Sequence, residues 1–209
     1  ERQKARLEER YLRNILEELV ADLEELKDDQ EARRTELQLF EQVLASVQDG
    51  RITAEPQLVV NAITYLLTTF FFLPNDAHFE TLKSTGQLNI IRNPELLTDL
   101  QDLYKTRYRV IEKNNADVSQ FKDEIATPHL MEYALFKARR GQISPDGWQR
   151  IISDPQLQNF FLYTSISLSS CMQANNTGIQ SLESLLRKLD EELQEPGASL
   201  PADTSSTAH

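Results

Sequence analysis

Apolar residues recur along residues 1–48 at alternating spacings of four and three, with no proline or glycine among them. This spacing is typical of a long amphipathic helix whose apolar stripe packs against other helices. At about 1.5 Å per residue, such a helix would extend about 70 Å, and Gly50 marks its expected end. The stripe comprises Leu12, Leu16, Leu19, Leu23, Leu26, Leu37, Phe40, Leu44 and Val47.

Polar residues interrupt this stripe at Gln30 and Arg33. They could specify the register of the helix against its partners, or they could mark a slight break. The interpretation we favour is a solvated stretch at the edge of a bundle. The same helix carries eight carboxylates between residues 17 and 31, which we interpret as a solvated face rather than as a cation site.

The stretch 55–72 is apolar on nearly every face and predicts a second long helix, the most buried of the fold. It contains too many polar residues to cross a membrane, and no stretch reaches the roughly 18–20 consecutive apolar residues that a membrane helix needs. A short helix over 77–84 is predicted next, capped by Asn75-Asp76 and closed by Gly86.

The clearest helix start is Asn93-Pro94, where the asparagine is a cap and the proline takes the first helical position. We expect this helix to continue toward Lys122. Pro128 should kink or divide it before a helical segment over 130–140. Its predicted apolar face comprises Leu96, Leu100, Leu103, Tyr104, Tyr108 and Ile111.

A turn over 141–147 and a short helical piece precede Asp154-Pro155, which repeats the cap-plus-proline signal and opens a last long helix. Residues 195–209 lack periodicity and bulky apolar side chains, so we expect a disordered tail. No strand pattern occurs in the sequence. The predicted fold is all-α: residues 1–194 form an elongated antiparallel helical bundle of about four long helices with short connecting helices.

The formal net charge of −11 argues against nucleic acid as a partner. A single cysteine, Cys171, cannot form an internal disulfide. Cations outnumber acids at the N-terminus, where they could meet anionic lipid headgroups or belong to an ordinary mixed-charge helix. These cations are Arg2, Lys4, Arg6, Arg10 and Arg13.

The sequence lacks the usual patterns of catalysis and metal binding. Its histidines fall in no metal-binding spacing, and it contains neither a nucleophile motif nor a glycine-rich phosphate loop. We therefore predict no catalytic residue, no metal, no cofactor and no enzyme activity. A polar cleft for a ligand or partner is conceivable, although we favour a solvated surface face. Its candidate contacts are Lys83, Arg92, Tyr104, Arg107 and Tyr108.

Two segments carry a family resemblance. The first, ERYLRNILEELVADLEEL, lies near the start, and the second, ETLKSTGQLNIIRNPELLTDLQDLY, follows Phe79, a position where tyrosine is usual. Together they resemble an uncharacterised bacterial family with one N-terminal transmembrane helix and a helical domain outside the cytoplasm. The resemblance implies an anchor just before Glu1, attachment to the bacterial inner membrane and a periplasmic domain. It implies no reaction and no catalytic residues.

The predicted function is therefore a non-catalytic, membrane-tethered helical domain for protein interaction, scaffolding or sensing. A homo-oligomer or a partner helix could pack on the apolar stripe of residues 12–47. The alternative is a sensor that binds a small anionic ligand near Lys83, Arg92 and Tyr104. An enzyme with a dispersed carboxylate site is a third hypothesis, which would need two acids to meet in a cleft.

Overall fold

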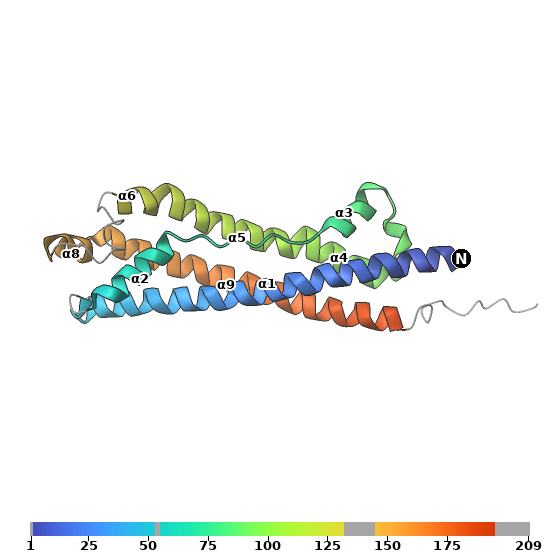
Figure 1. The fold of residues 1–209 in the computed structure, drawn as a ribbon, viewed down its shortest axis with the longest axis horizontal. Coiled ribbons are helices and arrows are strands. Elements are labelled where there is room, and N and C mark those ends of the chain that lie inside the picture. Colours follow the sequence, from blue (N-terminus) through green and yellow to red (C-terminus); the bar gives the residue numbers. More distant parts are fainter. Residues whose placement is uncertain (1, 53–54, 132–144, 195–209) are drawn as a thin grey trace, which may run out of the picture.

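The computed structural model describes residues 2–52, 55–131 and 145–194, and every regular element in those ranges is helical. The prediction of an all-α fold is confirmed. Three long helical segments run side by side along an elongated molecule (Figure 1). The first is α1 (Arg2–Gln48), and the last is α9 (Pro155–Gln194).

The middle long segment, residues 94–131, is helical throughout but changes its hydrogen-bond pattern twice. Two wider π-helical turns separate its three α-helical parts. Pro128 is the second residue of α6 and follows the second of these turns, which accommodates its missing N–H. The chain stays helical across Pro128 to Met131, so the predicted division at this proline is not seen in the described residues. The parts in order are α4 (Pro94–Asp102), η3 (Leu103–Arg107), α5 (Tyr108–Phe121), η4 (Lys122–Ala126) and α6 (Thr127–Met131).

The second predicted helix is shorter than expected. α2 (Pro56–Leu66) ends six residues before the predicted end at Phe72, and an extended stretch leads to α3 (Ala77–Ser84). The sequence after Leu66 is rich in β-branched and aromatic residues and ends in Pro74, which disfavours helix at the preceding residue. The arrangement of about four long helices is therefore not confirmed, because the described residues contain three.

The predicted stop signals at Gly50 and Gly86 and the predicted start signal at Asn93 are confirmed. Gly50 and Gly86 both adopt left-handed backbone angles, with φ of 68° and 69°, after the ends of α1 and α3. The Asn93 side chain accepts hydrogen bonds from the backbone N–H groups of Glu95 and Leu96. These contacts satisfy N–H groups that a helix start leaves unpaired, so the sequence signal and its physical role agree.

The apolar core consists of two clusters at opposite ends of the molecule. The first joins the start of α1, α3, α4 and the end of α9, and the second joins the end of α1, α2, α6 and the start of α9. α9 is therefore antiparallel to α1, whereas α5 runs parallel to α1. The stripe on α1 packs inside the chain: Leu12, Leu19, Leu26 and Phe40 are almost fully buried.

Buried polar side chains lie between the two apolar clusters. Arg33 is only 2 % exposed and Gln30 only 7 %, so the interpretation of this stretch as solvated is wrong. Asp22 and Asp29, from the acidic run on α1, are also withdrawn from solvent. The helix keeps its register through this region because the polar groups find partners on neighbouring helices.

Two short helices complete the description: η2 (Leu88–Ile90) precedes α4, and α8 (Pro145–Ile152) precedes α9. The predicted continuation of the middle helix over 132–140, most of the turn over 141–147 and the predicted disordered tail lie outside the described residues. Within the described ranges, no helix combines the length and the apolarity that crossing a membrane requires.

Candidate functional site

Arg33 lies at the centre of a hydrogen-bonded network that joins all three long segments. Its guanidinium donates to Asp29 at 2.7 Å and to the side-chain oxygen of Asn115 on α5 at 2.9 Å. Asn175 of α9 donates to the same Asp29 carboxylate at 2.7 Å. A buried charge is tolerable only when it is paired and hydrogen-bonded. Because these partners lie on α1, α5 and α9, a shift of any one helix would break the network.

Lys122, in η4, makes the second buried contact between segments. Its ammonium lies 2.6 Å from Glu36 and donates to the backbone oxygens of Tyr65 and Thr68 at 3.0 and 2.8 Å. Those oxygens lie at the end of α2, where a cation is favourable because helix C-termini carry partial negative charge. Burial raises the pKa of Glu36 and lowers that of Lys122, and their mutual attraction opposes both shifts.

Asp22 anchors the extended stretch that follows α2. One of its oxygens accepts from the backbone and side-chain nitrogens of Asn75, at 2.9 and 2.7 Å, and the other accepts from the Tyr108 hydroxyl at 2.6 Å. Burial raises the pKa of Asp22, although these hydrogen bonds oppose the shift. Asn75 was predicted as a helix cap, but its side chain serves this contact instead.

The predicted ligand contacts fall into two groups. Tyr104 and Tyr108 lie together in the core, edge to face with ring centroids 5.4 Å apart, and burial raises the pKa of both phenols. The three cations lie at the surface and each contacts a carboxylate. The pairs are Lys83–Glu80 at 2.6 Å, Arg92–Glu8 at 2.5 Å and Arg107–Asp102 at 2.9 Å.

These contacts give the cations structural roles. Arg92 pairs through both its backbone N–H and its side chain with Glu8, whose own side chain is buried, and thereby ties the start of α4 to α1. The cavity beside Arg92 measures only about 10 Å³, too small for a metabolite. The structure therefore brings the two tyrosines together but does not place the three cations around one cavity.

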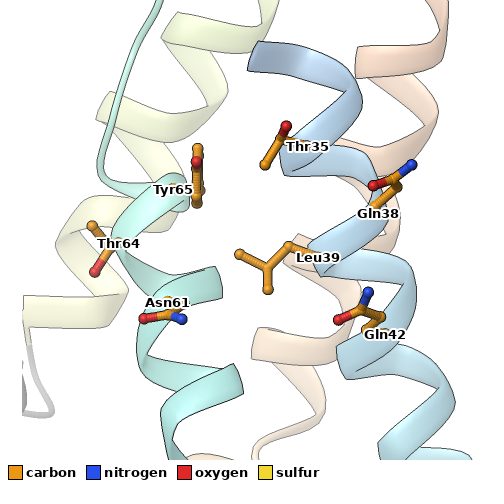
Figure 2. A pocket seen from close by; sticks show the side chains of 7 residues that line it. All are labelled: Thr35, Gln38, Leu39, Gln42, Asn61, Thr64 and Tyr65. Carbon is orange, nitrogen blue, oxygen red and sulfur yellow. The ribbon is translucent and has the colours of Figure 1, made fainter. Parts of the chain in front are cut away.

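A separate opening, which we call the α1–α2 cleft, has a volume of about 360 Å³. Seven side chains line it, four from α1 and three from α2, and Leu39 points from α1 across the opening toward α2 (Figure 2). Sequence reasoning missed this site because its residues form no motif. The lining residues are Thr35, Gln38, Leu39, Gln42, Asn61, Thr64 and Tyr65.

The hydrogen-bonding capacity of the α1–α2 cleft is largely unused. Within the described part of the chain, the amides of Gln38 and Gln42 have no hydrogen-bond partner. Asn61 uses only its oxygen, which accepts from Gln57, so its NH₂ group is available. Thr35 and Thr64 donate to backbone oxygens of their own helices, which leaves their hydroxyl oxygens free to accept.

A second surface depression runs between α9 and the middle segment. It consists of two neighbouring cavities of about 280 and 430 Å³, which share Arg107 and Thr177. Its charged residues are paired across or along the groove: Lys188 contacts Asp99, and Arg107 contacts Asp102. Both cations among the described lining residues of this groove therefore already contact a carboxylate.

Metal and thiol chemistry receive little support from the described residues. No group of three or more His, Cys, Asp or Glu side chains among them could hold a metal ion. Cys171 is buried, and burial raises its pKa, which disfavours the reactive thiolate. His78 and His129 each contact one carboxylate, Glu18 at 2.8 Å and Asp154 at 2.7 Å.

Comparison of the chain with protein-family models, with curated proteins and with solved structures gives no match.

Proposed function

We propose that this chain is a non-catalytic helical domain, tethered to a bacterial inner membrane through an N-terminal anchor, that works in protein interaction, scaffolding or sensing. Its scaffold is an elongated helical bundle on the periplasmic side, in which α9 is antiparallel to α1 and α5. One observation carries the proposal: the strongly buried ionisable side chains are used to join helices. Arg33, Lys122 and Asp22 each contact a partner from another segment.

Such contacts favour a rigid rod over a reactive site. A buried polar contact specifies register, because a slipped helix would leave a charge without its partner. A rod of this kind can hold a surface at a fixed distance from a membrane or transmit a displacement along its axis. The exposed cations at the start of α1 support placing this end of the rod beside the membrane, where they would meet anionic headgroups. They are Arg2, Lys4, Arg6, Arg10 and Arg13.

Membrane attachment is tested on the natural protein with whatever sequence precedes Glu1. We expect it in the membrane fraction after washes with high salt and with alkaline carbonate, which remove proteins held by charge alone. Protease added to spheroplasts should then digest the helical domain. Release of the protein by carbonate would contradict the anchor. Protection of the domain from protease would contradict the periplasmic orientation.

Exposed apolar side chains support the interaction role. Phe71 and Leu73, in the extended stretch after α2, are 61 % and 73 % exposed, whereas Phe72 between them is buried. Sedimentation velocity should detect self-association that the double variant Phe71→Ser/Leu73→Ser abolishes. Val20→Ser, at another exposed apolar position, serves as the control and should leave the sedimentation unchanged. A monomer at all concentrations would contradict the homo-oligomer.

The alternative of an anionic-ligand sensor receives less support. Lys83, Arg92 and Arg107 already contact carboxylates, so an added anion would have to displace a partner from each. A thermal-shift series with inorganic phosphate tests it directly. A concentration-dependent rise in Tm that Arg92→Gln removes would favour the alternative over the interaction role.

A further inference from the structure

We propose that the α1–α2 cleft binds an uncharged, hydroxyl-rich ligand of the saccharide class. This inference goes beyond the proposed interaction role and does not depend on membrane attachment. Its starting point is the lining of the cleft: all seven described side chains are neutral, in a chain whose residues are 26 % charged. A charged ligand entering the cleft would lose hydration without gaining an ion pair from these residues.

The lining can both donate to and accept from a ligand. Gln38 and Gln42 each offer an amide oxygen and an NH₂ group, and Asn61 offers its NH₂ group. The hydroxyl oxygens of Thr35 and Thr64 act as acceptors, because their protons bond backbone oxygens. A sugar hydroxyl donates one hydrogen bond and accepts others, so it matches this mixture better than a group that only accepts or only donates.

The cleft also has apolar surface. Leu39 extends between the two helices, and Tyr65 presents its ring at one end of the opening (Figure 2). A pyranose has an apolar face of C–H groups that can lie on an aromatic ring or an aliphatic side chain. The volume of about 360 Å³ falls within the range of small-molecule sites, roughly 300 to 1,000 Å³.

The walls of the cleft are held in place by the buried contacts beneath them. The backbone oxygen of Tyr65 accepts from Lys122, which is paired with Glu36 of α1 at 2.6 Å. The two helices that form the cleft are thus fixed relative to each other before a ligand arrives. A preformed site loses less conformational entropy on binding, which favours measurable affinity from a small number of hydrogen bonds.

The test uses saturation-transfer difference NMR on the whole chain with maltose, N-acetylglucosamine and glucose as probes at millimolar concentration. We expect saturation transfer to at least one neutral sugar and none to glucose 6-phosphate. Gln42→Ala and Asn61→Ala should each weaken the Kd about tenfold, the effect of losing one or two hydrogen bonds. Both residues are exposed, so the fold should survive.

The matched control is Gln173→Ala, which removes an exposed glutamine amide from the groove between α5 and α9. It should leave sugar binding unchanged. Absence of transfer to all three neutral sugars overturns the proposal, as does binding that survives both cleft variants. Self-association that Gln42→Ala alone abolishes would instead identify the cleft as a protein interface. None of these results changes the carbonate-wash outcome, so the two proposals fail separately.

Discussion

The ammonium nitrogen of Lys122 lies 2.6 Å from a carboxylate oxygen of Glu36, and the two side chains are 2 % and 0 % exposed. This ion pair connects η4 to α1 across 86 positions of sequence. The backbone oxygens at the end of α2 share the same ammonium, so three segments meet at one cation. The stability and the register of the bundle should therefore depend on it.

Removing one member of this pair should be costly, and removing both should not. Lys122→Met leaves the Glu36 carboxylate buried without its cation, and we expect a loss of about 3 to 5 kcal/mol in unfolding free energy. The double variant Lys122→Met/Glu36→Leu should recover most of that loss. Urea unfolding measures both. Lys113→Met breaks an exposed pair with Asp117 and should leave the unfolding free energy nearly unchanged.

Adjacent asparagines on α9 should respond differently to the same substitution. Asn175→Asp places a second carboxylate beside Asp29 in a buried setting, and we expect a loss of about 3 kcal/mol in unfolding free energy. Asn176→Asp keeps the oxygen that accepts from Gln30 and lies at the surface, so its effect should stay within about 0.5 kcal/mol. Equal losses in thermal unfolding would show that the Asp29 contact is unimportant.

The stability of the fold should fall with rising pH because of Asp22. Burial raises the pKa of this carboxyl above its ordinary value of 3.8, so the folded state favours the protonated form. Its stabilising contribution is complete below pH 3.8 and is lost as the pH rises through the folded pKa. Asp22→Asn cannot ionise, so the unfolding free energy of the parent should fall relative to the variant from acidic toward neutral pH. A constant difference between the two proteins across that range would contradict the assignment.

Gly178 of α9 packs against Leu26 of α1 and Ile111 of α5. A Cβ atom at this position would lie 2.7 Å from the terminal methyl of Ile111 and 3.6 Å from Leu26. Alanine gains about 1 kcal/mol of helix propensity over glycine but must push that methyl aside. Ile111→Val removes the methyl. Gly178→Ala/Ile111→Val should therefore be about 1 kcal/mol more stable than the sum of the single effects in a double-mutant cycle. Additive single effects would contradict the close approach.

The helix boundaries that sequence reasoning located were those with local causes. Gly50 and Asn93 act through backbone angles and hydrogen bonds within a few residues of themselves, and both were predicted. The burial of Arg33 was missed because its partner Asn115 lies 82 positions away. An arginine that interrupts an apolar stripe is expected to be exposed to solvent unless a hydrogen-bond acceptor from another helix is known. Sequence spacing alone does not reveal such an acceptor.

The candidate site was harder to predict than the fold. Lys83 and Arg92 were candidate contacts of a polar cleft, but each already pairs with a carboxylate, Glu80 and Glu8 respectively. The residues of the α1–α2 cleft come from two helices and carry no charge. Thr35 and Gln42 match an ordinary exposed helix face, so only the position of α2 against α1 brings them to one opening.

The central claim is that buried polar contacts hold the long helices in one register. Electron-electron distance measurements between spin labels at the exposed positions 17 on α1 and 116 on α5 test it most directly, in a Cys171→Ala background. We predict one narrow distance distribution for the parent protein and a broadened or shifted one for Lys122→Met/Glu36→Leu, even where that variant remains as stable. An unchanged narrow distribution in the double variant would contradict the claim.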